Sequence, residues 1–192
     1  RDAVREVNPE SGGRDWPGGW TTEQLATIGS LYRQGMAERS SESTHYFNTS
    51  PGLYKDAGLI ASALPEARFV YCRRDARDNC LFVYNTQYRA ANFHAYNLKQ
   101  TAEYYLHYNL MMEFWQARLG DRMVRVEYED FVYRSEDLLP ELLEHCGIGE
   151  TSRMATPLLH SREIGHWENY ASLFAPLEGV FSDIERRLFT PA

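Results

Sequence analysis

The sequence predicts an α/β fold in which helices cover both faces of a parallel sheet. Two short runs, at 68–72 (RFVYC) and 123–128 (MVRVEY), are rich in the β-branched and aromatic residues typical of buried strands. The segment between them carries apolar residues at helical spacing over 95–119. A helical connection of this length crosses over in a right-handed sense and makes the two strands parallel.

The first part of the chain predicts an arm followed by the α/β domain. Residues 1–20 contain Pro9, Pro17 and two glycine pairs, so we expect a flexible arm with no regular element, anchored by Trp16 and Trp20. The domain then spans residues 21–192.

The elements between this arm and the strand at 68–72 are predicted from local signals. Thr22 caps a helix that ends near Gly35. We expect a further strand at 45–47 (HYF), ending in the polar residues 48–50, and then a helix at 53–64.

A second set of elements follows the strand at 68–72. Asp75 is placed to cap a helix, and Asp78, three residues later, approximates a capping box with it. Beyond the strand at 123–128, a short amphipathic helix is expected at 137–146, stopped by Gly147. Residues 148–192 have loop character, with a final helix near 183–188.

The turn after the strand at 68–72 has the chemistry of a phosphate site. A helix N-terminus offers unpaired amides and a positive dipole end, and Arg73, Arg74 and Arg77 add three guanidinium groups. The alternative is a solvated cluster neutralised by neighbouring acids. In a parallel sheet the polar ends of the strands at 48–50, 73–74 and 128–129 converge on one edge, which favours the phosphate interpretation.

Composition excludes several classes of function. The net charge of −7 disfavours nucleic-acid binding, because such proteins need excess Lys and Arg. Cys72, Cys80 and Cys146 lack metal-ligand spacing and are expected to be free thiols in a reducing compartment. No apolar run is long enough to span a membrane and no signal peptide is visible, so we expect a soluble cytoplasmic protein.

Four stretches of the chain together resemble the sulfotransferase family, especially bacterial members related to tetratricopeptide-repeat sulfotransferases. They are GLIASALPEARFVYCRRDARDNCLFVY, the tyrosine-rich helix after it, VRVEYEDFV and IGHWENYASLFAPL. The resemblance implies a P-loop NTPase-like fold, and use of 3′-phosphoadenosine 5′-phosphosulfate (PAPS) to transfer a sulfuryl group to a hydroxyl or amine.

The resemblance also implies the nucleotide-binding residues. Arg74 matches the arginine that grips the 3′-phosphate, a task suited to a planar fork of donors. Tyr128 matches the tyrosine that lines the nucleotide pocket, although a core tyrosine at a strand end is the alternative. Gly165 and Trp167 match a glycine and a tryptophan near the chain end, and Arg162, in the loop before them, is the candidate second positive contact.

The sequence also departs from the family pattern. Phe82 stands eight residues after Arg74, where the family has a serine, and Thr49 replaces a lysine that stabilises the leaving phosphate. His45 lies nearby, but a histidine in a strand is more often structural. The glycine-rich phosphosulfate loop is expected before residue 1, and the sheet without that strand would expose an apolar seam.

Two classes of function therefore remain open. In the first, the chain is the C-terminal portion of a PAPS-dependent sulfotransferase whose catalytic groups lie upstream or on an oligomeric partner. In the second, it is a non-catalytic nucleotide-binding or protein-interaction module on the same scaffold. In either case we expect weak binding of the product nucleotide, no turnover of labelled PAPS by the isolated chain, and no metal; catalytic residues are unassigned.

Overall fold

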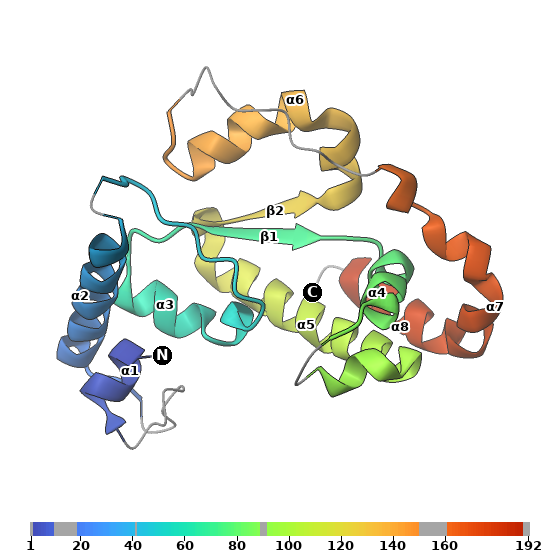
Figure 1. The fold of residues 1–192 in the computed structure, drawn as a ribbon, viewed down its shortest axis with the longest axis horizontal. Coiled ribbons are helices and arrows are strands. Elements are labelled where there is room, and N and C mark those ends of the chain that lie inside the picture. The colour runs from blue at the N-terminus through green and yellow to red at the C-terminus, as the bar shows by residue number, and fades with distance from the viewer. Residues whose placement is uncertain (1, 10–18, 41, 89–91, 150–160, 190–192) are drawn as a thin grey trace. The chain divides into compact units, whose positions relative to one another are not determined.

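A computed structural model describes residues 2–9, 19–40, 42–88, 92–149 and 161–189 of the chain. The chain divides into two compact units, Arg1–Arg68 and Phe69–Ala192 (Figure 1). The predicted boundary between an arm and a domain at residue 20 stays a prediction.

The first unit is helical in its described part. Its elements are α1 (Asp2–Val7), α2 (Thr22–Arg39), the 3₁₀ turn η2 (Leu53–Lys55) and α3 (Ala57–Ala63). Its buried apolar cluster comprises Val4, Ile28, Leu59 and Ala63. Trp20 packs against this cluster, as expected of an anchor, whereas Trp16 lies outside the described residues.

Gly29 allows α2 and α3 to approach closely. A Cβ atom built on Gly29 would lie 2.1 Å from the backbone oxygen of Ala63, which is far inside van der Waals contact. Helix packing in this unit therefore requires glycine at this position.

Three predictions for the first unit are wrong. Helix α1 forms in the arm, where no regular element was expected, because Val4 is buried against α2. The segment 45–47 is not a strand, since Tyr46 and Phe47 are exposed and no neighbouring strand pairs with it in the described chain. Thr21, not Thr22, caps α2 through a capping box with Gln24.

The second unit begins with a strand and returns to a parallel strand through helices. Its elements are β1 (Phe69–Arg73), α4 (Ala76–Asn85), η3 (Phe93–Tyr96), α5 (Leu98–Leu119), η4 (Gly120–Arg122), β2 (Met123–Glu127) and α6 (Tyr128–His145). They are followed by η5 (Ser161–Glu163), η6 (His166–Tyr170), α7 (Ala171–Phe174), η7 (Ala175–Leu177) and α8 (Glu178–Phe189).

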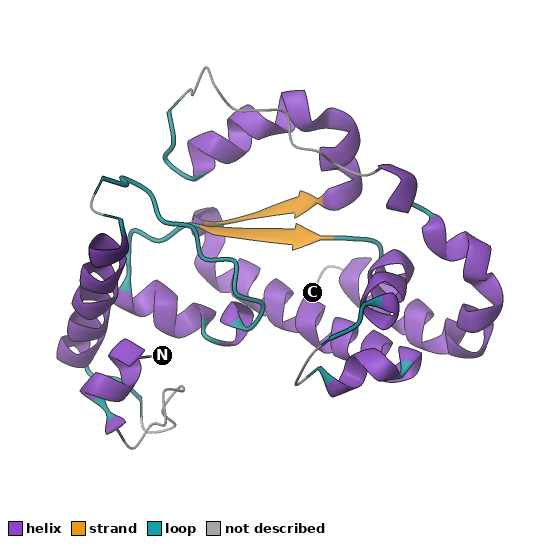
Figure 2. Ribbon diagram, viewed as in Figure 1, coloured by secondary structure: helices purple, strands orange, loops and turns teal. Residues whose placement is uncertain are grey.

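Strands β1 and β2 form a parallel pair with helices on both of its faces (Figure 2). On one face the Tyr71 hydroxyl donates to Asn109 of α5. On the other face α6 lies over the strands, and the His145 ring contacts the Phe69 carbonyl at 3.2 Å. The predicted fold class, a parallel sheet between helices, is therefore confirmed, with two strands in the described residues.

The main core of the second unit lies among α4, α5, α7 and α8. Its buried members are Cys80, Leu81, Ala102, Tyr105, Phe174, Phe181 and Ile184. Burial raises the pKa of the Cys80 thiol to about 12, so this side chain remains a neutral core group.

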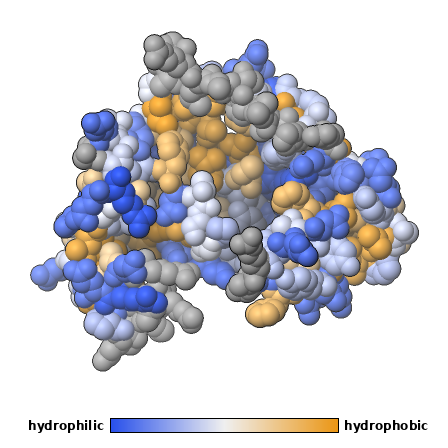
Figure 3. All heavy atoms as spheres, in the orientation of Figure 1, coloured by the Kyte–Doolittle hydropathy of each residue, from blue (hydrophilic) through white to orange (hydrophobic). Residues whose placement is uncertain are grey.

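The face of the strands toward α6 is incompletely covered. Val70 is 45% exposed, Cys72 is also exposed, and none of the residues of α6 is fully buried. Figure 3 shows apolar side chains gathered over the strands and α6. The face of the strand pair toward α6 therefore carries exposed apolar surface, and the expected strand before residue 1 stays a prediction.

Two element boundaries differ from the predictions for the second unit. Tyr128 is the first residue of α6 rather than the last of a strand, and α6 continues through a kink at Arg134 into the predicted helix at 137–146. The end of the chain is more helical than expected, because residues 161–189 hold several short helices and turns.

Candidate functional site

The site begins at the junction of β1 and α4. The Asp75 carboxylate accepts hydrogen bonds from the backbone amides of Arg77 and Asp78, both at 2.9 Å, and so caps α4 as predicted. The Asp75 amide donates to Glu129 at 2.9 Å, so the predicted capping box with Asp78 is wrong. Since carboxylates already occupy these amides, the expectation that the helix N-terminus offers them to a phosphate is also wrong.

The three arginines of this turn do not act together. The Arg73 Nε donates to Glu127 at 2.9 Å, and the Arg77 Nη2 donates to Glu178 at 2.9 Å. These two acids lie far away in the sequence, whereas the alternative interpretation had supposed neighbouring acids. Arg73 and Arg77 therefore have structural ion pairs.

Arg74 is different because it lines a pocket. Its guanidinium lies 5.0 Å from the ring centroid of Tyr128 and 5.7 Å from that of Phe82. Its Nη2 donates to the Glu163 backbone carbonyl at 2.9 Å, and its Nη1 lies 3.6 Å from the Glu163 carboxylate. Its Nε is buried without a hydrogen-bond partner in the described part of the chain.

The pocket beside Arg74 has a volume of about 360 Å³. It is lined by Arg74, Asp78, Leu81, Phe82, Asn85, Thr86, Glu163 and His166. Asp78 and Phe82, four residues apart on one face of α4, both line it. Phe82 is 51% exposed, so it is not packed beneath the long helix α5.

Asp78 fixes the segment that closes one side of this pocket. Its carboxylate, which is 2% exposed, accepts hydrogen bonds from the amides of Gly165 at 2.6 Å and Trp167 at 2.9 Å. Gly165 has φ of +71°, a left-handed conformation that favours glycine. Asp78 is therefore a tether between α4 and the start of η6.

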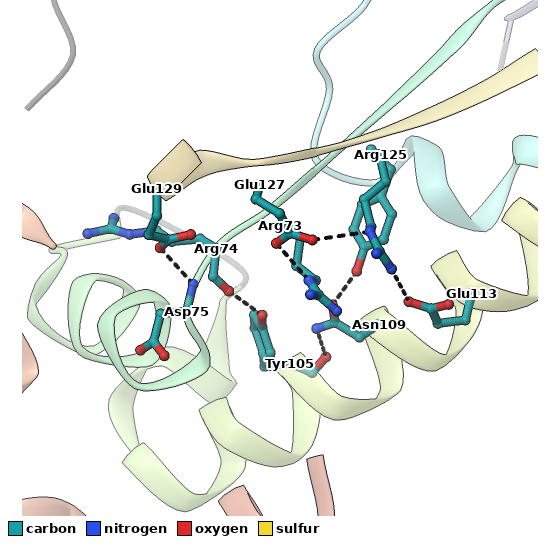
Figure 4. Close-up of polar contacts among 10 residues, drawn as sticks. Arg73, Arg74, Asp75, Tyr105, Asn109, Glu113, Arg125, Glu127 and Glu129 are labelled. Carbon is teal, nitrogen blue, oxygen red and sulfur yellow. Dashed lines mark hydrogen bonds and ion pairs between the residues drawn. The ribbon is translucent and has the colours of Figure 1, made fainter. Parts of the chain in front are cut away.

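A buried polar chain holds the backbone of Arg74 (Figure 4). The Tyr105 hydroxyl donates to the Arg74 carbonyl, Asn109 donates to the Tyr105 carbonyl at 2.8 Å, and Tyr71 donates to Asn109. Burial raises the pKa of both tyrosine hydroxyls, so they remain neutral donors. Helix α5 thereby positions the turn that carries Arg74.

The predicted binding residues are partly brought together. Arg74 and Tyr128 are in contact, and Gly165 lies on the segment tethered by Asp78. Arg162 belongs to η5, but its side chain lies outside the described residues. The polar segment 48–50 belongs to the first unit, so its place beside Arg74 stays a prediction.

Sequence reasoning missed Glu163 and Glu129. Glu163 holds the Arg74 fork, and Glu129 accepts from the Asp75 amide. Glu129 could have been suspected, because it follows the second strand and parallel strand ends meet at one edge. Nothing in the sequence near Glu163 indicates its partner, since the two residues lie 89 positions apart and the intervening fold decides the contact.

Two further findings concern the described residues. They contain no group of three or more His, Cys, Asp or Glu side chains that could hold a metal ion. No helix in the described ranges has the length and apolar character needed to cross a membrane.

Taken together, a parallel strand pair with an arginine beside a pocket at the strand end defines an α/β protein with a candidate site at the carboxyl end of its sheet. The chain belongs to the sulfotransferase family, whose family model matches residues 19–152. Arg74 and Tyr128 lie inside this match, while Arg162 and Gly165 lie beyond it. The chain matches no curated protein and no solved structure, and the kinship to tetratricopeptide-repeat members stays a prediction.

Proposed function

We propose that this sulfotransferase family chain binds PAPS, with the nucleotide's 3′-phosphate on Arg74, in support of sulfuryl transfer to a hydroxyl or amine. The observation that carries the proposal is Arg74, which lines the pocket, has its guanidinium near two aromatic rings and has a side chain that is only 15% exposed. A guanidinium fork in such a poorly hydrated setting is suited to bidentate recognition of phosphate.

The residues present fit one phosphate of this nucleotide. The Arg74 Nε is a buried donor that lacks an acceptor among the described residues. Its Nη2 donates to the Glu163 carbonyl, and its Nη1 lies 3.6 Å from the Glu163 carboxylate. Tyr128 supports the guanidinium with its ring, and Asn85, Thr86 and His166 supply polar groups around the pocket. Bound PAPS would supply the sulfuryl group; we assign no residue of this chain to the transfer step.

A second candidate is a nucleotide-binding module without catalysis on the same scaffold. It is favoured by Phe82, which lines the pocket where the family pattern has a hydroxyl donor. In this candidate Arg74 keeps its role, and the chain alone gives no turnover of labelled PAPS. Loss of one donor that faces developing charge typically slows such reactions by ~10²–10³.

Calorimetry with adenosine 3′,5′-bisphosphate tests the proposal. We expect the chain to bind this nucleotide weakly and Arg74→Ala to weaken it about ten- to hundredfold, the value of one charge-assisted contact. Arg74→Lys should restore only part of the affinity, because a single ammonium lacks the fork.

The control is Arg134→Ala, which removes an exposed arginine of α6 that pairs only locally with Asp137. This variant should bind like the wild type. Equal heats from the wild type and Arg74→Ala, or no heat from either, would contradict a phosphate site at Arg74.

A further inference from the structure

The Arg74 fork is already occupied by an acid of the same chain. The backbone carbonyl of Glu163 accepts from Nη2 at 2.9 Å, and its carboxylate lies 3.6 Å from Nη1. Two oxygen atoms from one residue thus face the two terminal nitrogens, as two oxygens of a phosphate would. We propose that Glu163 is a specificity-determining residue, an internal competitor that a ligand must displace from Arg74; this inference rests on the proposed function.

The charges around the pocket make this displacement selective. Among the described lining residues, Arg74 contributes one positive charge, and Asp78 and Glu163 contribute two negative charges. The Asp78 carboxylate is held by the amides of Gly165 and Trp167 and stays in place. An incoming anion therefore gains only if its attraction to Arg74 exceeds that of Glu163, which favours a doubly charged phosphate monoester over a singly charged group.

Glu163 is able to leave without unfolding the site. Its side chain is 40% exposed, against 15% for Arg74, so water can solvate the released carboxylate. It lies at the end of the three-residue turn η5, and the backbone after it is tethered separately by Asp78 at Gly165. Movement of Glu163 therefore does not require movement of η6.

Calorimetric titration of four full-chain variants with adenosine 3′,5′-bisphosphate tests the inference. They are the wild type, Glu163→Gln, Arg74→Ala and the double variant. Glu163→Gln keeps the size of the side chain and removes its charge, so we expect about two- to fivefold tighter binding, which corresponds to the loss of a partly exposed ion pair. In the Arg74→Ala background the same change should alter affinity less than twofold, because the competitor then has no fork to occupy.

Glu168→Gln is the matched control, since Glu168 is a nearby exposed acid of η6 that does not line the pocket. A gain with Glu163→Gln that Glu168→Gln does not reproduce supports direct competition. An equal gain in both variants, or a gain that persists without Arg74, overturns it in favour of general charge repulsion.

The remaining outcomes separate this inference from the proposed function. Binding that depends on Arg74 but is unchanged or weakened in Glu163→Gln overturns the inference and leaves the proposed function standing. Binding by Glu163→Gln alone, with none by the wild type, supports both. If none of the four proteins binds, removal of the Glu163 charge does not let Arg74 take a phosphate, and both are contradicted.

Discussion

Phe82 is the residue at which this chain departs most clearly from the sulfotransferase pattern within its pocket. Its ring is half exposed, lines the pocket and lies 5.7 Å from the Arg74 guanidinium. An aromatic ring offers a phosphate no hydrogen bond and takes volume that the ligand needs. Its contact with the cation stabilises the pocket without ligand by ~0.5–1 kcal/mol.

Phe82→Ser should raise the affinity for the bisphosphate nucleotide and lower the stability of the fold without ligand. The new hydroxyl adds a donor to a charged ligand, so we expect binding of the bisphosphate nucleotide to tighten by ~1–2 kcal/mol, roughly five- to thirtyfold. The unfolding free energy without ligand should fall by about 1 kcal/mol, because a half-exposed ring loses only part of its burial. Calorimetry and thermal unfolding on the same sample measure both quantities.

The control for this change is Phe93→Ser, because Phe93 is 80% exposed and does not line the pocket. It should alter neither quantity appreciably. Lost stability in Phe82→Ser with no gain in affinity would mean that the family's serine has no counterpart at this position.

For single residues, the sequence predicted which side chains lie at the turn after β1 but not which acids pair with its arginines. Asp75 was identified as the cap from local spacing, and Arg74 was singled out by the resemblance to the sulfotransferase family. The acids that hold Arg73, Arg74 and Arg77 come from β2, η5 and α8, which only the tertiary fold brings to the turn. Local charge patterns therefore named the wrong counter-ions.

Between elements, the Asp78 carboxylate tethers α4 to the start of η6 through two hydrogen bonds. One buried carboxylate satisfies two backbone amides that follow each other closely in the chain. Without it these amides would be left unpaired in a partly buried setting, which is costly. The tether explains how a segment distant in sequence is held against the pocket.

Asp78→Asn should loosen this segment. The amide side chain offers one accepting oxygen, and its NH₂ group faces a donor, so one bond is lost and we expect a destabilisation of ~1–3 kcal/mol. Urea unfolding measures the stability, and hydrogen exchange should show faster exchange at the amides of Gly165 and Trp167. Asp121→Asn, at an exposed position of η4, is the control. Wild-type stability with both amides still protected would refute the tether.

Elements with strong periodicity were predicted well. The strands at β1 and β2 and the long helix α5 were recovered, because buried faces impose their spacing on the sequence. The segment 45–47 was mistaken for a strand because aromatic propensity alone does not supply a pairing partner. Helix α1 was missed because its stability comes from burial of Val4 against another helix rather than from its own sequence.

For the molecule as a whole, the sequence predicted the class of fold but not its division into two units. The compact units meet in sequence between Arg68 and Phe69, directly before β1. Everything shown of the pocket belongs to the second unit, so Arg74 and its partners form one structural assembly around the strand pair. The role of the segment 48–50 depends on the first unit and remains a prediction.

The central claim is that Arg74, alone among the arginines of its turn, receives the phosphate of the nucleotide. Heteronuclear NMR of the arginine Nε–Hε groups in nitrogen-labelled protein tests it directly, with the Arg74 signal assigned by its absence in Arg74→Lys. On addition of adenosine 3′,5′-bisphosphate we expect this signal to shift in a saturable way, while those of Arg73 and Arg77 stay near their starting positions because their ion pairs persist. An unmoved Arg74 signal at saturating nucleotide, or equal shifts at all three arginines, would contradict the account.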